Sequence, residues 1–567
     1  MDDAAPAASA SERRPPPADG VRWTRLDSSI AAGLAIVNVL AHLPFRARHL
    51  STWDSVLFAL GMDRYSVPEG RPHPPGYPVY IALARLGRPM FADENATLVA
   101  LSLVMAGLAV AFVYALGRRL MPRGAAAVAA ILFGLSPVLA HNSVIATSYA
   151  GEALFAVAVA WAAWTARRSP GPRSAAVLGA VFLLALGFRQ SLLFYLTPLV
   201  AWALVVGWGV GPGWPRDLAR RAAAFVASSL AVGLAWLVPM LVTSGGPRAY
   251  GEATSLQTRL VVFENTVFNH GRAAWDDHWT RFLIYVRPET LYVLPVLAVL
   301  VIAAVLAGRT ARGRRLAASG QARVLASEGW VFLALWILPA LLFYLLVFDG
   351  WDKGPDGYAL VLLPPLYLAY AAIGWACVSR VRAAVPEGPT SRASTILAVL
   401  LLVPGLGMVG SWDMALREVS DHDAWIEAWQ AIDTEFPAND TAIVASYSWA
   451  HTKWFFPDHI LWSRLAIPPG PDWDHPWVLT MQTQHREDDV GFYEAHLRGP
   501  MPTAHPIPAN IKRVVLFDFQ LAGENGGTRT LQPEIEVHES QLESGWRVLW
   551  FAPDAQHPTI ESCFVDG

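Results

Sequence analysis

The residues with the clearest chemical potential lie between the first and second apolar runs of the chain. Asp54 stands in Trp53-Asp54-Ser55-Val56-Leu57-Phe58, a segment apolar enough to lie along a membrane surface. A carboxylate held there is partly desolvated, which makes it a better base near neutral pH. Asp54 is therefore a candidate general base. The alternative is a surface acid that solubilises an interfacial helix.

A second motif, His73-Pro74-Pro75-Gly76-Tyr77-Pro78, follows in the same stretch. Its prolines fix φ and its glycine permits a sharp turn, so the chain is punctuated just before an apolar helix that begins near Pro78. His73 then sits at a rigid turn beside the segment that holds Asp54, where it can shape or contact a substrate pocket. The alternative interpretation is that this run only marks the start of a helix.

Two further ionisable residues interrupt the apolar runs. Arg189 stands alone between two such runs, where a charge is costly unless it is paired. It either holds a phosphate group or snorkels at the tip of a hairpin. Glu152 lies at the start of another apolar run, where it can supply a second acid to the site or only complement the helix dipole.

The polar loop before residue 358 contributes Lys353, a candidate phosphate contact, and Tyr358, a candidate interfacial anchor. A metal hypothesis would rest on His270, Asp276, Asp277 and His278. These four residues lack a recognised ligand spacing, so no metal site is predicted. The sequence also lacks a Gly-rich phosphate loop, and nucleotide hydrolysis is not supported.

The elements that must position these residues are membrane helices. The chain has 567 residues, of which 54% are hydrophobic and only 16% are charged. This composition is typical of a protein whose solvent is a bilayer. The formal net charge of -3 gives no reason to expect a nucleic-acid partner. Two cysteines, far apart in sequence, make a disulfide framework improbable.

Apolar runs recur as far as residue 412 and predict about 11 transmembrane helices. They lie near residues 28–44, 96–116, 124–141, 149–166, 174–188, 191–208, 222–242, 288–307, 329–348, 358–378 and 394–412. The segment 174–208 is either one long span or a hairpin of two. With a cytoplasmic N-terminus and the hairpin, every inside segment carries several arginines and the short outer loop 142–148 carries none, which matches the positive-inside rule.

Three regions follow from this topology. Residues 1–27, rich in Ala and Pro, are expected to form a disordered cytoplasmic tail. Residues 28–412 form a polytopic α-helical membrane domain with two long outer loops, 44–95 and 243–287. Residues 413–567 are expected to form a small extracytoplasmic α/β domain.

The composition changes abruptly in this last region, where apolar runs shrink to strand length. Thr441–Ala445 and Lys512–Phe517 are predicted strands. Residues 423–435 are predicted to form an amphipathic helix, because Trp425, Ile426, Trp429 and Ile432 recur on one side.

The order of a first span, an outer loop that opens with Asp54, the run from His73 to Pro78 and then short-looped spans resembles the GT-C superfamily of membrane glycosyltransferases. More narrowly, it is similar to the protein O-mannosyltransferase-like group. The resemblance covers the region up to about residue 210 well and the rest only in layout. Many relatives have Asp-Glu where this chain has Asp54-Ser55, so the second acidic function is missing or comes from elsewhere.

The resemblance implies a GT-C-like fold and a hexosyl- or mannosyltransferase-like enzyme. Such enzymes take a sugar from a polyprenyl-phosphate carrier on the extracytoplasmic face and transfer it to a hydroxyl of a protein, lipid or glycan, with an acid like Asp54 as base. Arg189, with Lys353, would hold the phosphate that leaves. His73, Glu152 and Tyr358 would contact the substrates. No sequence motif requires a cofactor, and the sequence does not decide whether the enzyme uses a divalent cation.

Membrane lipids are expected partners, and the Arg- and Ala-rich composition suggests a bacterial inner membrane. Two other functions fit many spans. A transporter or lipid flippase would also explain an intramembrane Arg189, but neither paired halves nor interrupted helices in matching positions are visible. The second alternative is a noncatalytic membrane scaffold whose C-terminal region binds a partner.

Overall fold

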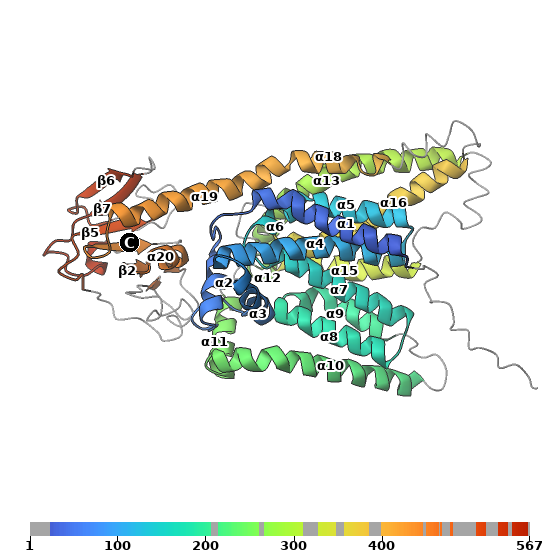
Figure 1. Ribbon diagram of the computed structural model, residues 1–567, viewed down its shortest axis with the longest axis horizontal. Coiled ribbons are helices and arrows are strands. Elements are labelled where there is room, and N and C mark those ends of the chain that lie inside the picture. The colour runs from blue at the N-terminus through green and yellow to red at the C-terminus, as the bar shows by residue number, and fades with distance from the viewer. Residues whose placement is uncertain are drawn as a thin grey trace, which may run out of the picture.

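The computed structural model describes most of the chain from Trp23 to Phe564. The described ranges are 23–205, 214–259, 266–309, 327–347, 357–384, 399–445, 449–463, 465–467, 477–479, 506–517, 531–542 and 547–564. These residues form an elongated bundle of helices with a mixed sheet beyond one of its ends (Figure 1). We call this end of the bundle the sheet end.

The helices are α1 (Arg25–His42), η1 (Leu43–Phe45), α2 (Trp53–Asp63), α3 (Pro78–Gly87), η2 (Arg88–Met90), α4 (Glu94–Leu120), α5 (Arg123–Leu135), α6 (Pro137–Val144), α7 (Tyr149–Arg168), α8 (Pro172–Phe188), α9 (Leu192–Leu204), α10 (Trp214–Thr243), α11 (Pro247–Gln257), α12 (Val267–His270), α13 (Arg272–Gly308), α15 (Ser327–Leu346), η4 (Gly357–Val361), α16 (Leu363–Ala384), α18 (Val403–Gly410), α19 (Trp412–Glu435), α20 (Trp449–Phe455) and η5 (Glu561–Cys563). The strands are β1 (Thr441–Ala445), β2 (Ile460–Ser463), β3 (Leu465–Ile467), β4 (Trp477–Leu479), β5 (Arg513–Phe517), β6 (Val537–Gln541) and β7 (Arg547–Phe551).

Several helices have the length and composition of membrane spans. Among the described residues, five helices are long and apolar enough to cross a bilayer, or six if the bent pair α5 and α6 counts as one span. The five are α1, α4, α7, α10 and α15, and α8, α9 and part of α13 are apolar but shorter. A helix overlaps each predicted span. The total of eleven spans stays a prediction, whereas the polytopic helical character is confirmed.

The segment 174–208, as far as residue 205, where this part of the description ends, contains two helices, as the hairpin alternative predicts. α8 ends at Phe188 and α9 begins at Leu192, and both pack against α7. The amide of Arg189 still donates to the carbonyl of Ala185 at 2.9 Å, and the chain turns immediately after it. Arg189 therefore lies at the junction of the two helices.

The span predicted near 124–141 is bent in the middle. α5 and α6 meet at Ser136 with a bend of 56°. Pro137 cannot donate a backbone N–H, so α5 ends there. The Ser136 hydroxyl accepts from the amide of Leu139 at 3.3 Å and caps α6. The same hydroxyl donates to the buried carboxylate of Glu289 on α13, which ties the bend to a neighbouring helix.

The outer loops also contain more helix than predicted. The segment 243–287 holds α11, α12 and the first turns of α13, which continues without interruption to Gly308. The span predicted from apolar residues begins only at residue 288, because the first turns of α13 contain both charged and aromatic residues. The segment 44–95 contains α2 and α3, which lie across the sheet end of the bundle (Figure 1).

The predicted boundary between residues 412 and 413 falls in the first turn of α19, a helix that reaches the sheet. α19 starts directly after α18 with only Ser411 between them. Its first half buries Ala415, Leu416 and Val419 and packs on α6, whereas its second half reaches the sheet. The Trp429 ring lies 4.6 Å from that of Phe517 on β5. The amphipathic helix predicted at 423–435 is thus the end of a longer connecting helix.

The residues after α19 combine strands with a helix. Five strands form one sheet in the order β2-β1-β5-β7-β6. β1 is parallel to β2 and β5, while β7 is antiparallel to β5 and β6. Both predicted strands are confirmed, as β1 and β5. All five residues of β1 are buried, as expected for a strand inside a sheet.

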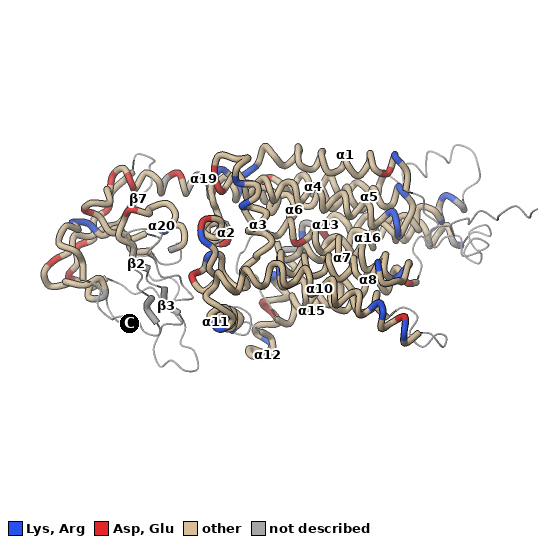
Figure 2. Tube along the Cα trace, turned by 60° about the horizontal axis from the view of Figure 1, so that its bottom comes forward, with Lys and Arg blue, Asp and Glu red and all other residues tan. Residues whose placement is uncertain are grey.

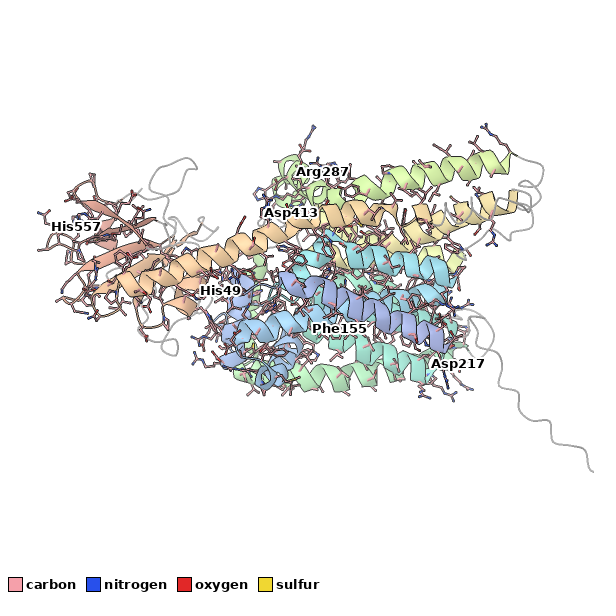
Figure 3. The ribbon with its side chains drawn as sticks, turned by 45° about the horizontal axis from the view of Figure 1, so that its top comes forward. His49, Phe155, Asp217, Arg287, Asp413 and His557 are labelled. Atoms are coloured by element: carbon pink, nitrogen blue, oxygen red, sulfur yellow. The ribbon has the colours of Figure 1, made fainter. Side chains whose placement is uncertain are left out.

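Charged residues are concentrated at the two ends of the bundle and are scarce in its middle. Figure 2 shows most Lys, Arg, Asp and Glu at the ends of the bundle and on the sheet region. In Figure 3, His49, just before α2, lies at the sheet end, while Asp217 on α10 lies at the opposite end. The apolar middle matches a bilayer interior, and the segment that carries Asp54 lies at one end of it.

Candidate active site

The first turn of α2 positions Asp54. Thr52 caps this helix: the Ser55 amide donates to its hydroxyl at 3.1 Å, and the Thr52 amide donates to the Ser55 hydroxyl at 3.0 Å. Residues 55–62 are buried, whereas the Asp54 side chain is 33% exposed. Ser55, which follows the candidate base, therefore stabilises the helix start and leaves Asp54 at the surface of the site.

A tight turn between α2 and α3 positions His73. The backbones of Ser66 and Arg71 pair in an antiparallel bridge, and the Gly76 amide donates to the carbonyl of His73 at 3.0 Å. Gly76 has φ +109°, a conformation that L side chains rarely adopt. The Tyr65 hydroxyl donates to the Gly76 carbonyl at 2.6 Å. The backbone bridge and the hydrogen bonds at Gly76 thus fix the conformation of the turn, as the motif predicts.

Gly76→Ala is expected to destabilise the protein by at least about 1 kcal/mol, because its φ disfavours any Cβ. A Cβ at this position would also lie 2.6 Å from the Tyr65 hydroxyl and 2.8 Å from the Val67 side chain. Thermal unfolding in detergent measures the effect. Gly251→Ala on α11, where a Cβ meets nothing within 4 Å, is the control. A melting temperature for Gly76→Ala equal to that of the wild type would contradict the expectation.

His73 links Asp54 to Tyr77. Its Nε2 lies 3.0 Å from the Tyr77 hydroxyl and 3.6 Å from Oδ1 of Asp54. The imidazole is 7% exposed and packs against the Phe58 ring at 5.5 Å. Burial lowers the pKa of His73 from its ordinary 6.5; the charge of Asp54 opposes this shift and that of Arg189 reinforces it. At neutral pH the ring is therefore neutral, and its Nε2 shares a hydrogen bond with Tyr77 while it lies close to the Asp54 carboxylate.

Acidification is expected to destabilise the protein partly through His73. The unfolded chain binds a proton at this residue below about pH 6.5, whereas the folded protein resists it. The stabilisation is therefore complete above that pH and is lost as the pH falls toward the lowered pKa. Melting temperatures measured from pH 8 to pH 5 should fall less for His73→Gln than for the wild type. Identical slopes for the two proteins would exclude this contribution.

Arg189 and Glu152 form a buried ion pair. Nε of Arg189 lies 2.9 Å from Oε2 of Glu152, and the two side chains are 4% and 0% exposed. Nη1 of Arg189 donates to the Ser148 hydroxyl at 2.8 Å, and the Ser191 hydroxyl donates to Oε1 of Glu152 at 2.9 Å. The interpretation of Arg189 as a snorkelling arginine is wrong, since its charge is neutralised inside the protein.

Three tyrosine rings surround the Arg189 guanidinium. Its central carbon lies 4.4 Å from the ring centre of Tyr149, 4.8 Å from that of Tyr358 and 5.6 Å from that of Tyr77. Cations are attracted to aromatic faces at such distances. Tyr77 contacts both His73 and Arg189, so the Asp54 side and the Arg189 side belong to one continuous site.

The structure brings together five of the six predicted site residues. They are Asp54, His73, Glu152, Arg189 and Tyr358. Lys353 lies outside the described residues. Sequence reasoning assigned no role to Tyr77, Ser148 or Tyr149. Tyr77 stands inside the His-Pro-Pro-Gly-Tyr-Pro run, and Tyr149 precedes Glu152 by three residues on α7, so both share a turn with a predicted site residue.

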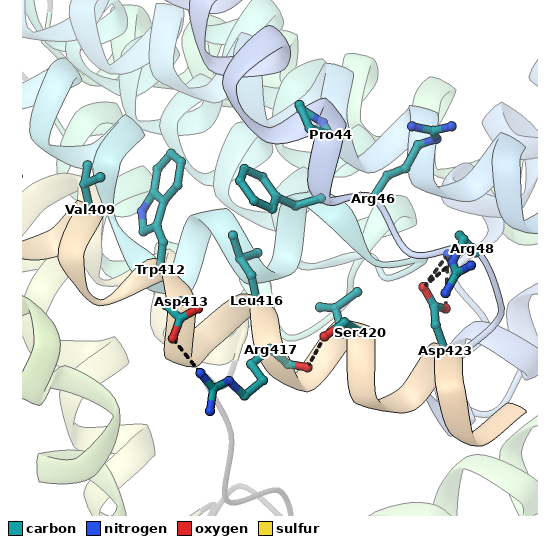
Figure 4. A pocket seen from close by; sticks show the side chains of 12 residues that line it. Pro44, Arg46, Arg48, Val409, Trp412, Asp413, Leu416, Arg417, Ser420 and Asp423 are labelled. Carbon is teal, nitrogen blue, oxygen red and sulfur yellow. Dashed lines mark hydrogen bonds and ion pairs between the residues drawn. The ribbon is translucent and has the colours of Figure 1, made fainter. Parts of the chain in front are cut away.

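A groove of about 670 Å³ opens elsewhere at the sheet end, between η1 and α19 (Figure 4). Phe45, Trp412 and Leu416 contribute its apolar wall, and Arg46 and Arg417 are among its charged lining. Asp54, His73 and Arg189 do not line it. Across the described ranges, no group of three or more His, Cys, Asp or Glu side chains is arranged to hold a metal ion.

Comparisons with known proteins agree with this architecture. The family model of the "Protein O-mannosyl-transferase TMEM260 N-terminal domain" matches residues 69–208. No curated protein sequence matches the chain. The fold is similar to two crystal structures of ArnT from Cupriavidus metallidurans, bound to undecaprenyl phosphate (14% identity, TM-score 0.53) and in the apo state (13%, 0.54). Each alignment covers 93% of this chain and 98% of ArnT.

The likeness to the oligosaccharyltransferase of Archaeoglobus fulgidus is more distant, with a TM-score of 0.42 at 13% identity over 76% of this chain and 63% of that one. The matching family model is that of a protein O-mannosyl-transferase, and the ArnT structure contains undecaprenyl phosphate. The predicted resemblance to this superfamily is therefore confirmed, and the chain has a polytopic helical membrane fold of the GT-C type.

Proposed function

We propose, from this GT-C-type fold, that the chain is a glycosyltransferase that moves a sugar from a polyprenyl-phosphate carrier to a hydroxyl acceptor. One observation carries the proposal: a partly exposed carboxylate, Asp54, contacts a buried neutral histidine and, through Tyr77, adjoins a caged arginine at the membrane boundary. Such a site offers a base and a cation where a lipid-borne donor can reach both.

The reaction is a single displacement. The acceptor oxygen attacks the anomeric carbon while its proton passes to Asp54, and the bond between that carbon and the phosphate oxygen breaks. The carrier phosphate leaves with the electron pair, and the configuration at the anomeric carbon inverts. A positioned base and a cation at the leaving phosphate both lower the barrier of such a transfer.

Arg189 is the proposed cation for the leaving phosphate. Among the contacts of the described residues, Glu152 forms an ion pair with Nε and the Ser148 hydroxyl accepts from Nη1, so Nη2 is the nitrogen proposed to bind an oxygen of the phosphate. The tyrosine rings exclude water, which strengthens the electrostatic attraction. Glu152 then orients the guanidinium rather than serving as a second acid. Lys353 is retained as a second candidate contact.

The proposed location is the extracytoplasmic face of a bacterial inner membrane. The arginine-rich loops between the spans favour a cytoplasmic position for the end that holds Asp217. Asp54 and the sheet share the other end, so both would face the outside, where the sheet region could contact the acceptor. The complex of ArnT with undecaprenyl phosphate supports a carrier of this class.

Purified protein in proteoliposomes, supplied with radiolabelled mannosyl polyprenyl phosphate and with other hexosyl carriers, tests the proposal. We expect one carrier to be converted to polyprenyl phosphate, with the sugar recovered on an added hydroxyl acceptor or on water. Movement of intact carrier across the bilayer without cleavage of the sugar–phosphate bond would contradict it and would favour a flippase.

A further inference from the structure

A carboxylate on α19 binds the backbone of the segment that leads into α2. The amide of Arg48 donates to Asp423, 2.9 Å from Oδ2 and 3.1 Å from Oδ1 (Figure 4). The amide of His49 donates to Oδ1 at 3.0 Å. The Asp423 side chain is only 5% exposed. Since a buried carboxylate is costly unless its oxygens accept hydrogen bonds, these amides explain why an acid is tolerated there.

The segment it holds is the connection from the first membrane helix to the candidate base. On the side of the bundle, the amide of Ala47 donates to the carbonyl of Val144 at 2.8 Å, and the Asn95 side chain donates to the carbonyl of Ala47 at 3.1 Å. Asp423 fixes the next two residues from the opposite side. The chain then reaches Thr52, the cap of α2, and Asp54. Only Leu50 and Ser51 separate the amides that Asp423 holds from this cap.

α19 is itself joined to the sheet region. Its second half packs on β5 through Trp429 and Phe517, and α20 of the same region packs on α2. A change in the position of α19 therefore reaches the start of α2 through Asp423. The exposed pair Arg48 and Glu427, at 3.0 Å, adds a second contact between the same two elements.

We infer that Asp423 is a positioning residue of the transfer reaction, which holds the start of α2 so that Asp54 faces the substrates. The inference rests on the proposed function. In this arrangement the sheet region, through α19, sets the position of the base, and an acceptor that engages the sheet region can influence the rate of transfer.

Asp423→Ala tests this inference, with Asp413→Ala as the matched control. Asp413 lies on the same helix, but its ion pair with Arg417 is exposed. Because a displacement of about 1 Å can cost about 100-fold in rate, we expect Asp423→Ala to lower kcat by about 10- to 100-fold and to change the KM for the donor by less than about threefold. Asp423→Asn, which keeps one acceptor oxygen, should lose less. An unchanged kcat in Asp423→Ala would overturn the inference.

A double variant separates positioning from a general structural role. If Asp423 acts through Asp54, then Asp423→Ala causes no further loss in the Asp54→Asn background. If Asp423→Ala lowers kcat by the same factor in the Asp54→Asn background as in the wild type, Asp423 acts independently of Asp54, and the inference is overturned.

Hydrogen exchange distinguishes a failure of this inference from a failure of the proposed function, because it does not depend on catalysis. Peptides that contain residues 48–55 should exchange faster in Asp423→Ala than in Asp413→Ala. Unchanged exchange would overturn the inference even if sugar transfer is observed. Faster exchange in a protein that transfers no sugar would refute the proposed function and leave the attachment of this segment to α19 established.

Discussion

Asp54→Asn is expected to reduce the rate of sugar transfer by about 10²- to 10⁴-fold, the range typical for loss of a general base. Asn has the size of Asp but cannot take the acceptor proton. The hydrogen bonds between Thr52 and Ser55 that start α2 do not involve the Asp54 side chain, so the fold should be retained. Initial rates in proteoliposomes, with the polyprenyl phosphate released as the readout, measure the effect.

Asp63→Asn is the control for this variant. Asp63 lies at the end of the same helix and pairs with Arg88 at the surface, at 2.9 Å. Loss of a surface ion pair changes stability little, and we expect transfer within about twofold of the wild-type rate. A folded Asp54→Asn protein that transfers sugar as fast as the Asp63→Asn control would exclude Asp54 as the base.

Arg189→Met is expected to destabilise the protein by about 3–5 kcal/mol, the cost typical of breaking a buried ion pair. The Glu152 carboxylate is fully buried and would keep only the Ser191 hydroxyl as a described partner. Glu152→Gln should also destabilise, since it leaves the guanidinium without its counter-charge. Unfolding in mixed detergent micelles measures both effects.

The double variant Glu152→Gln/Arg189→Met separates stability from function. Replacing both charges by neutral groups of similar size removes the unpaired charge, so stability should recover relative to Arg189→Met. If the guanidinium binds the donor phosphate, the KM for the donor should still rise by about 10- to 100-fold, because a charged hydrogen bond is lost. A double variant with wild-type stability, wild-type kcat and wild-type donor KM would show that the pair is only structural.

The membrane helices and two strands could be predicted because their signals are local. An apolar run of bilayer length dictates a helix, since every backbone polar group must be satisfied inside the chain. The same holds for the turn at His73, where prolines and Gly76 restrict the backbone to a few conformations. Asp54 and His73 lie in the same predicted outer loop, which made their proximity predictable, but their separation of 3.6 Å depends on how α2 packs against the turn.

The remaining features depend on packing between distant segments. Glu152 lies on α7 and Arg189 at the junction of α8 and α9, and no sequence periodicity indicates that these segments bring the two side chains together. The three tyrosines around Arg189 come from three separate segments for the same reason. The early turns of α13 and the first half of α19 were not predicted, because these helical turns lack the continuous apolar run on which the prediction of spans relied. The hydrogen bonds of Asp423 to a segment near residue 48 have no local signal at all.

An experimental structure of the protein with bound undecaprenyl phosphate tests the central claim most directly. The account predicts density for the phosphate within hydrogen-bonding distance of the Arg189 guanidinium, with the Asp54 carboxylate facing the same space. Phosphate density in the groove beside Arg46 and Arg417, with Asp54 turned away from it, would contradict the account.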